Sequence, residues 1–202
     1  MQYIKKQWEK FTQKTLFGKA SDILFVLLII AMLIPASRKQ ISAFTARLIA
    51  MNPSVIDLEK QKTLSASEYQ WEFTDMQGNT VSLSDFEGKP VFLNFWATWC
   101  PPCIAEMPDI QKLYDRFGEQ AAFILISDED PQQISQFMQK RGFNMPVYIH
   151  KTRVPALFAS SSIPTTFVIS PEGGIIIQKT GAAKWNSKKM VGLMTEMLQQ
   201  KD

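Results

Sequence analysis

The residues best suited to covalent chemistry are two cysteines separated by two prolines, in the segment Cys100-Pro101-Pro102-Cys103. They are the only cysteines in a chain of 202 residues, too few for a secreted scaffold that depends on several disulfides. A tetrahedral zinc site needs four ligands, and the single histidine, His150, is far from the pair in sequence. Isoleucine follows the second cysteine where a haem-attachment motif has histidine, so that chemistry is excluded. The pattern therefore indicates thiol–disulfide exchange.

The cysteine pair stands between a predicted strand and a predicted helix. The apolar run Val91–Ala97 is typical of a central strand buried on both faces, and residues 102–117 predict the helix. Unpaired N–H groups and a partial positive charge at the helix N-terminus favour a thiolate at Cys100. We therefore expect Cys100 to be exposed and nucleophilic. Cys103, one turn into the helix, is expected to be covered and to resolve the mixed disulfide.

The chain from Tyr69 onward alternates strand-like and helix-like patterns. Two strands at 69–74 and 80–83 predict a β-hairpin, and further strands are expected at 121–127, 146–150, 165–169 and 174–180. Helices are expected at 130–141, 154–159 and 187–200. This alternation predicts an α/β fold in which helices flank a central mixed β-sheet.

The N-terminal part differs in charge from the rest. Residues 1–50 contain eight Lys or Arg and two Asp or Glu, whereas the other 152 residues contain fourteen basic and seventeen acidic residues. The predicted domain therefore lacks the basic excess of a nucleic-acid-binding protein, and we expect no nucleic-acid partner. Basic residues that flank an apolar segment are instead typical of a membrane protein.

The apolar segment is a run of twelve residues, Ile23–Ile34. At 1.5 Å per residue it would form about 18 Å of helix, so flanking residues must contribute if it is to cross a bilayer. A cleaved signal peptide and a buried core helix are the alternatives. No small-x-small cleavage pattern follows the run, and lysines precede it. We expect an uncleaved signal anchor at 22–37, with the basic segment 1–21 in the cytoplasm and the later residues on the periplasmic side of a bacterial inner membrane.

Residues 38–66 are expected to connect the anchor to the folded domain. Apolar residues recur there at helical spacing (Ile41, Phe44, Leu48 and Ile49), which predicts an amphipathic segment. Asn52-Pro53 ends it, and the following polar stretch reads as a linker. The domain is then expected to occupy residues 67–202.

The segment from Asn94 to Cys103 resembles the active-site segment of the TlpA/ResA group of membrane-anchored, thioredoxin-family disulfide reductases. Residues 83–89 are similar to the segment that precedes it in that group, and residues 163–169 are similar to the strand that follows. The resemblance covers about residues 67–200. It implies a thioredoxin-like fold with an N-terminal β-hairpin, a central helix–strand insertion at 128–150, and no cofactor or metal.

The resemblance also implies roles for individual residues. Asn94 stands where thioredoxin has a buried aspartate. Glu106 matches an acidic residue that could relay the proton of Cys103, although its spacing alone fits a solvated helix residue equally well. Pro164 matches a cis-proline that restrains Ile163, so that its backbone can pair with a substrate strand. Trp99 is a candidate substrate contact or a packing residue. Three further aromatic residues are read as structural: Trp71, His150 and Trp185.

The implied activity is reduction of disulfides in extracytoplasmic proteins, such as apocytochromes c, by the Cys100/Cys103 dithiol. The expected partners are proteins with cysteines or disulfides, and a thiol donor embedded in the membrane. A dithiol oxidase of the same fold and a thiol-based copper carrier are alternatives. A peroxide reductase of the peroxiredoxin type is a further alternative, but its motif is P-x-x-x-[ST]-x-x-C. This chain has Leu93 in place of the proline and Ala97 in place of the serine or threonine.

Overall fold

The computed structural model describes residues 15–33, 45–46, 49–150 and 152–199. The chain divides into two compact units, residues 1–42 and 43–202. In the first unit the described element is helix α2, Leu16–Leu33. Across the described ranges, no helix is both long enough and apolar enough to span a membrane. The expected anchor at 22–37 and the expected amphipathic segment lie in part outside the described residues.

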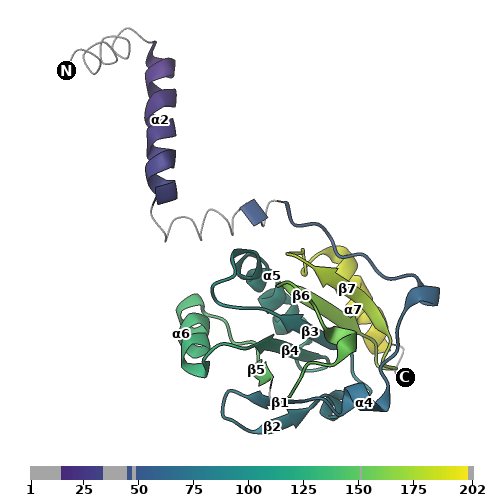
Figure 1. Ribbon diagram of the computed structural model, residues 1–202. Helices are drawn as coiled ribbons and strands as arrows, with labels where there is room; N and C mark the ends of the chain where they lie inside the picture. The colour runs from purple at the N-terminus through teal and green to yellow at the C-terminus, as the bar shows by residue number, and fades with distance from the viewer. Residues whose placement is uncertain (1–14, 34–44, 47–48, 151, 200–202) are drawn as a thin grey trace. The chain divides into compact units, whose positions relative to one another are not determined.

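The second unit is built on a seven-stranded mixed sheet with the strand order β2-β1-β5-β4-β3-β6-β7 (Figure 1). The strands are β1 (Glu72–Asp75), β2 (Thr80–Ser82), β3 (Val91–Phe95), β4 (Ala122–Ser127), β5 (Val147–His150), β6 (Thr165–Ile169) and β7 (Ile175–Thr180). The three central strands β3, β4 and β5 are parallel, and the other neighbours are antiparallel. The predicted α/β fold with a mixed sheet is confirmed.

Three helices pack on one face of this sheet: α5 (Pro101–Phe117), α6 (Pro131–Arg141) and α7 (Lys188–Gln199). The crossovers β3-α5-β4 and β4-α6-β5 run in the same direction across the sheet, and right-handed crossovers then place both helices on the same side. The opposite face is covered by a second apolar cluster that includes Trp71, Leu83 and Phe158. Two of these residues belong to the 3₁₀ helices η2 (Leu83–Phe86) and η3 (Ala156–Phe158), the second of which replaces the predicted helix at 154–159.

Strand β3 carries the chain to the cysteines, and its side chains alternate between the two faces. Phe92 belongs to the cluster under α5, whereas Val91 and Leu93 belong to the opposite cluster. By the same alternation Asn94 lies on the α5 face, where it is fully buried. The strand ends at Phe95, and the chain then turns into α5. A polar side chain is thereby placed beneath the helix that bears the cysteines.

Residues 50–64, which we call the strap, lie along the edge strand β7. Backbone hydrogen bonds join Ile56 N–H to the Ile176 carbonyl (2.8 Å) and Ile175 N–H to the Lys62 carbonyl (2.8 Å). At the far end, Lys184 N–H donates to the Met51 carbonyl (3.1 Å). Leu64 is buried, with 7% of its surface exposed. The stretch that the sequence suggests as linker therefore pairs with the sheet and covers its edge.

Candidate active site

The two cysteines form a disulfide at the start of α5, with a sulfur–sulfur distance of 2.12 Å. Cys100 is the N-cap residue of the helix, and its Sγ accepts a hydrogen bond from the Cys103 N–H (3.2 Å). The two prolines occupy the first helical turn, where the missing N–H groups have no intrahelical partner to lose. A sulfur at this position receives both an N–H donor and the positive end of the helix dipole. The geometry is therefore suited to stabilising a thiolate at Cys100.

The expected exposure of Cys100 is wrong for the disulfide form. Cys100 is 3% exposed and Cys103 is fully buried. The Cys100 sulfur is bonded to its partner and lies 3.8 Å from the Ile163 carbonyl oxygen, so neighbouring atoms cover it. The Ile163–Pro164 peptide bond is cis, as expected. Trp99, which precedes Cys100, has 56% of its surface exposed and is the open apolar side chain beside the pair.

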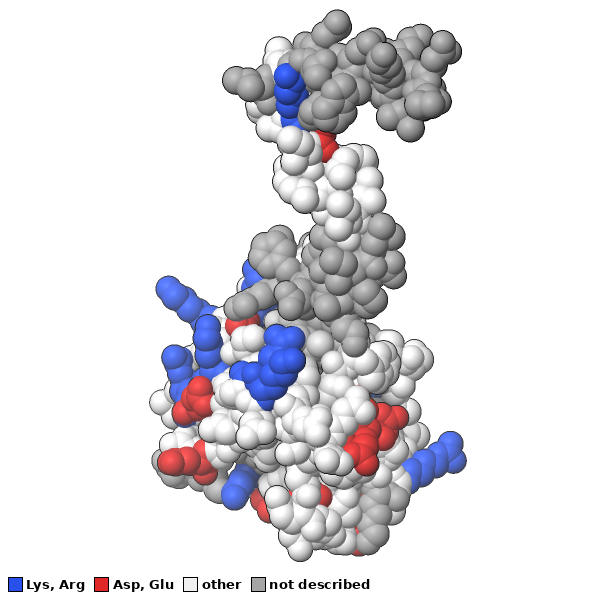
Figure 2. All heavy atoms as spheres, turned by 90° about the vertical axis from the view of Figure 1, so that its left-hand side faces the viewer, with Lys and Arg blue, Asp and Glu red and all other residues white. Residues whose placement is uncertain are grey.

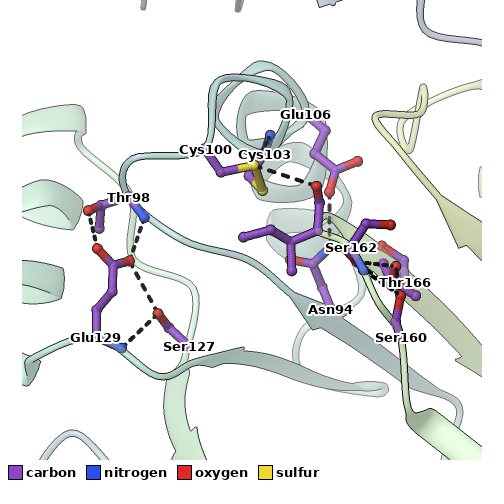
Figure 3. Close-up of a disulfide and its surroundings, with 12 residues drawn as sticks. Asn94, Thr98, Cys100, Cys103, Glu106, Ser127, Glu129, Ser160, Ser162 and Thr166 are labelled. Carbon is purple, nitrogen blue, oxygen red and sulfur yellow. Dashed lines mark hydrogen bonds between the residues drawn. A yellow bond between two sulfur atoms is a disulfide. The ribbon is translucent and has the colours of Figure 1, made fainter.

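Glu106 lies one turn after Cys103 on α5 and is 2% exposed, which excludes its reading as a solvated helix residue. Three N–H donors hold the carboxylate. Trp185 Nε1 (2.9 Å) and the Ala183 backbone N–H (3.1 Å) both donate to Oε2. Asn94 Nδ2 donates to Oε1 at 3.0 Å. Figure 3 shows the Glu106 side chain beside the disulfide, with its carboxylate directed toward Asn94.

Burial raises the pKa of Glu106 from its ordinary value of 4.5 to about 7. The hydrogen bonds from Trp185, Ala183 and Asn94 oppose this rise because they stabilise the carboxylate, and the charge of Asp109 adds to it. A carboxyl group with a pKa near neutrality can both accept and release a proton at physiological pH. The pKa of Glu106 is therefore suited to proton exchange near neutral pH.

Asn94 also donates from Nδ2 to the hydroxyl of Thr166 on β6, at 2.8 Å. Asn94 and Thr166 are directly opposite each other in the β3–β6 pairing, and both are buried. Asn94 Oδ1 is buried as well and has no hydrogen-bond partner among the described residues. The polar cluster beneath the disulfide thus consists of Asn94, Glu106, Thr166, Trp185 and the Ala183 N–H.

The sequence analysis gave no site role to three members of this cluster: Thr166, which pairs with Asn94, and the two residues Ala183 and Trp185, which bind Glu106. Trp185 is fully buried and binds the carboxylate of Glu106, so its reading as purely structural is incomplete. The Ala183 donor is a backbone N–H group, which no side-chain pattern could indicate. Both residues precede α7, more than seventy positions after Glu106, and only the fold brings them to α5. Trp71 lies in the core, and His150 lies at the end of β5, outside the cluster.

A second group of residues, which the sequence analysis did not identify, fixes the loop before the cysteines. The Glu129 carboxylate accepts hydrogen bonds from both the backbone N–H and the hydroxyl of Thr98, each at 2.6 Å (Figure 3). Gln133 Nε2 donates to Glu129 Oε1 (2.8 Å) and to the Thr98 hydroxyl (3.1 Å). Thr98 and Glu129 each follow one of the adjacent parallel strands β3 and β4, whose carboxyl ends meet at one edge of the sheet. In the sequence, the position of both residues just after adjacent parallel strands is the signal that could have predicted their contact.

Other candidate sites are separate from this chemistry. A cavity of about 530 Å³ lies between the β1–β2 turn, α6 and the segment that enters β5, with Met76, Met138 and Met145 in its wall. None of its lining residues belongs to the polar cluster or to the disulfide. Within the described ranges, no group of three or more His, Cys, Asp or Glu side chains is arranged to hold a metal ion.

The chain is similar to known thiol–disulfide oxidoreductases. It is 37% identical over 111 residues to the thiol–disulfide oxidoreductase ResA of Bacillus thuringiensis (strain Al Hakam), a match that covers 54% of this chain and 64% of that protein. It is 40% identical over 110 residues to ResA of Bacillus subtilis (strain 168), with 53% and 62% covered. The chain therefore spans just under two thirds of the length of these relatives. The resemblance to the ResA group is confirmed.

Solved structures show the same fold at lower identity. A secreted thiol–disulfide isomerase from Corynebacterium glutamicum superimposes with a TM-score of 0.58 at 20% identity, covering 72% of this chain and 90% of that one. A secreted Mycobacterium tuberculosis disulfide oxidoreductase, homologous to Escherichia coli DsbE, gives 0.53 at 20% identity, covering 67% and 99%. The thioredoxin-like fold is thereby established. Residues 64–178 match the AhpC/TSA family, which is more than half of the chain, and the chain belongs to that family.

Proposed function

We propose that this protein is a thiol–disulfide oxidoreductase that reduces disulfides in other proteins. The observation that carries the proposal is the Cys100–Cys103 disulfide at the N-terminus of α5, one helical turn before a buried carboxyl group with a pKa near 7. The relatives named ResA are themselves described as thiol–disulfide oxidoreductases, which supports the same activity here.

The reaction begins with the reduced pair. The Cys100 thiolate attacks one sulfur of a substrate disulfide, a mixed disulfide forms, and the first substrate sulfur leaves as a thiolate. Cys103 then transfers its thiol proton to Glu106 and attacks Cys100 Sγ. The mixed disulfide breaks, the second substrate sulfur leaves, and the Cys100–Cys103 disulfide forms. Two electrons pass from the protein to the substrate, and a thiol donor must return them before the next cycle.

The substrate is proposed to bind as an extended segment beside the disulfide. Trp99 offers an exposed apolar surface next to Cys100, and the Ile163 backbone, in the segment just before β6, lies against the Cys100 sulfur. An extended chain can pair its backbone with such a segment while an apolar side chain contacts the indole ring. Extracytoplasmic proteins with cysteines, including apocytochromes c, are the proposed substrates.

The protein is further proposed to be held at the bacterial inner membrane through its N-terminal segment, with the domain on the periplasmic side. Helix α2 exposes the consecutive apolar side chains from Ile23 to Leu27, which together cover all sides of the helix, and its two charged residues, Lys19 and Asp22, lie near its start. In Figure 2 the rest of the described helix is white, the colour of residues other than Lys, Arg, Asp and Glu. A helix that is apolar all round needs an apolar environment. The electron donor is then proposed to be a membrane-embedded thiol protein.

A test of the activity is reduction of insulin disulfides with dithiothreitol as the thiol donor. The wild-type protein is expected to accelerate insulin precipitation, and the Cys100→Ser variant is expected to show only the dithiothreitol background. Cys103→Ser should accumulate a mixed disulfide with substrate, because it can form that bond but cannot resolve it. Equal rates for the wild type and Cys100→Ser would refute the proposal. Rapid consumption of hydrogen peroxide with no insulin reduction would favour a peroxide reductase instead.

A further inference from the structure

The buried carboxyl of Glu106 has only one partner that can serve it in both protonation states. Trp185 Nε1 and the Ala183 N–H both bind Oε2 and can only donate. Oε1 has a single recorded partner, the side-chain amide of Asn94. When Glu106 takes up a proton, Oε2 is already occupied by two donors, so the proton must reside on Oε1. There it would face the Asn94 NH₂ group, and two donors would point at each other.

An asparagine amide can remove this conflict because it has an acceptor at one end and a donor at the other. In the present arrangement Asn94 Nδ2 donates to both Glu106 and Thr166. A half-turn of the amide would put Oδ1 in that place, where it can accept from the protonated Glu106 and from the Thr166 hydroxyl. Oδ1 is now unpaired, so the turn breaks no hydrogen bond at the other end. Two hydrogen bonds are made in either orientation.

We propose that Asn94 is the positioning residue for Glu106, and that its amide reverses when Glu106 gains or loses a proton, with Thr166 as its second partner in both orientations. An aspartate at this position has no N–H to donate to the ionised Glu106. Leucine or alanine could form a hydrogen bond with neither the ionised nor the protonated form of Glu106. Asn94, with Thr166 as its second partner, would therefore give Oε1 of Glu106 a donor when Glu106 is ionised and an acceptor when Glu106 is protonated. After the half-turn the NH₂ group lies where Oδ1 lies now.

Few charged groups face Glu106. On its own helix these are Asp109, whose charge acts on it, and the cysteines, which do not titrate while they form the disulfide. From β3 and β6 the facing groups are Asn94 and Thr166, and from the segment before α7 they are Trp185 and the Ala183 N–H. None of these four titrates near neutral pH. In the disulfide form a pH-dependent change at Asn94 therefore reports Glu106, and an Asp109→Asn variant tests how far the neighbouring charge contributes.

The inference rests on the proposed function for its biological meaning, because Glu106 there accepts the proton of Cys103. The reversal itself is a property of the disulfide form and requires no substrate. A protein that failed to reduce insulin could still show it, and an active reductase could lack it. The two proposals can therefore fail independently.

The test is NMR of the full chain in detergent micelles, oxidised, with isotope labels on asparagine, glutamate and threonine. The chain has five asparagines, so the Asn94 side-chain signals can be assigned by comparison with Asn94→Asp. Above pH 8 we expect nuclear Overhauser contacts between the Asn94 NH₂ protons and the Thr166 side chain. Below pH 6 these contacts should disappear, with the same midpoint as the titration of the Glu106 carboxyl carbon.

The control is Glu106→Gln, in which residue 106 cannot titrate, so the Asn94 signals should not change between pH 5 and pH 9. Asp109→Asn should retain the pH-dependent change. Contacts between Asn94 NH₂ and Thr166 that persist after Glu106 has titrated would overturn the proposal. So would a loss of these contacts in Glu106→Gln over the same pH range.

A kinetic measurement provides a second readout that a purely structural role would not affect. In Asn94→Asp, a second carboxyl group replaces the donor at Oε1, and like charge makes ionisation of the pair harder. The midpoint of the pH profile for release of the mixed disulfide should rise by at least one unit, which is about tenfold slower release on the acidic limb. Thr166→Ser keeps the hydroxyl and should leave the midpoint unchanged. A slower rate at every pH with an unshifted midpoint in Asn94→Asp would contradict the positioning role.

Discussion

At the scale of single residues, the chemistry depends on a carboxyl group balanced between burial and hydrogen bonding. Burial alone would favour the neutral acid of Glu106, and the three N–H donors alone would favour the carboxylate. The outcome is a pKa of about 7, near the middle of the physiological range. Because the carboxyl group is buried, each donor acts strongly, and the loss of a single one is expected to change the proton affinity of the site.

Replacing Glu106 with glutamine should affect the two cysteines in opposite ways. Removing a nearby negative charge should let the Cys100 thiolate absorbance appear at lower pH. Release of the mixed disulfide should slow by roughly 100-fold, because Cys103 loses its proton acceptor. Ultraviolet titration and stopped-flow release of a mixed disulfide measure the two effects separately. The matched control is Glu119→Gln, because Glu119 is an exposed acid two residues after the end of α5. Unchanged values for Glu106→Gln would assign Glu106 a packing role only.

The raised pKa of Glu106 also predicts how stability depends on pH. Between its ordinary value of 4.5 and about 7, the folded protein holds a proton on Glu106 that the unfolded chain has released. The free energy of unfolding should therefore fall as pH rises through this range, by on the order of 3 kcal/mol from this group. Urea unfolding of the oxidised protein at pH 5 and pH 8 measures the fall. The Glu106→Gln variant should lack this component, and parallel curves for the two proteins would show that the prediction is wrong.

At the scale of elements, the parallel strands β3 and β4 place their C-terminal loops side by side, and Glu129 joins them. Its carboxylate accepts two hydrogen bonds from Thr98, which is two residues before the nucleophilic cysteine. Ser127 Oγ lies 3.3 Å from the same carboxylate, and its hydroxyl also accepts from the Glu129 backbone N–H. The loop that carries Trp99 to the disulfide is therefore fixed by contacts with the neighbouring strand end as well as by its own helix.

Glu129→Ala is expected to loosen this loop. It removes charge-assisted hydrogen bonds, so a loss of about 2 kcal/mol in unfolding free energy and roughly a tenfold fall in insulin reduction are expected. Asp128→Ala removes the same charge from the adjacent, exposed position and should have little effect on either quantity. Thr98→Ser keeps both donors and should behave like the wild type, whereas Thr98→Val should be intermediate. Activity in Glu129→Ala equal to that of Asp128→Ala would remove the loop-fixing role.

The strap (residues 50–64) connects the edge of the sheet to the polar cluster around Glu106. Its Met51 carbonyl binds the Lys184 N–H, between the two residues that hold Glu106, Ala183 and Trp185. We expect a protein that lacks residues 1–42 to fold and to reduce insulin. A protein that lacks residues 1–64 should be less stable by about 2–4 kcal/mol, because β7 and the pocket of Leu64 become uncovered.

Urea unfolding and insulin reduction of the two truncated proteins test the role of the strap. A third protein with the strap present but Leu64→Ala separates loss of the apolar contact from loss of the backbone pairing. It should lie between the other two in stability. Equal free energies of unfolding for the two truncated proteins would mean that the strap does not stabilise the domain.

At the scale of the whole molecule, two units with different surfaces follow one another along the chain. The first contains α2, whose exposed residues are almost all apolar from Ile23 onward, and the second contains the enzyme fold. Lysines are concentrated before the apolar run, and the domain is slightly acidic. This division of charge and apolar surface is the support for the proposed membrane anchor.

Alkaline phosphatase fused after Ser67 should therefore be active in a bacterial host, because it would be carried across the inner membrane. The mature protein should keep its first residues and stay in the membrane fraction after carbonate washing. Mass spectrometry of the purified protein determines the N-terminus. An N-terminus beyond Ser37, or a fusion that is active only in the cytoplasm, would overturn the proposed anchor and topology.

Local sequence patterns were enough to predict most helices and strands and to identify the reactive cysteine pair. The apolar run before Cys100, the prolines in the first turn of α5 and the Asp130 N-cap of α6 are local signals, and strands and helices form where such signals predict them within a few residues. The reactive pair was identifiable because two cysteines at this spacing have few other uses. Glu106 and Pro164 were found through resemblance to a family, not through their spacing alone.

The surroundings of these residues depend on how the chain folds and could not be predicted from local patterns. Whether Glu106 faces water or the core depends on the segment before α7, which lies more than seventy residues away in sequence. The Ala183 donor is a backbone N–H group, so no side-chain type in the sequence indicates it. Cys100 is covered by the Ile163 carbonyl, and a polar stretch pairs with β7, because the order of strands in the sheet brings distant segments together. Local patterns specify elements, whereas burial and the proton affinity of a buried group depend on contacts that form only when the sheet is assembled.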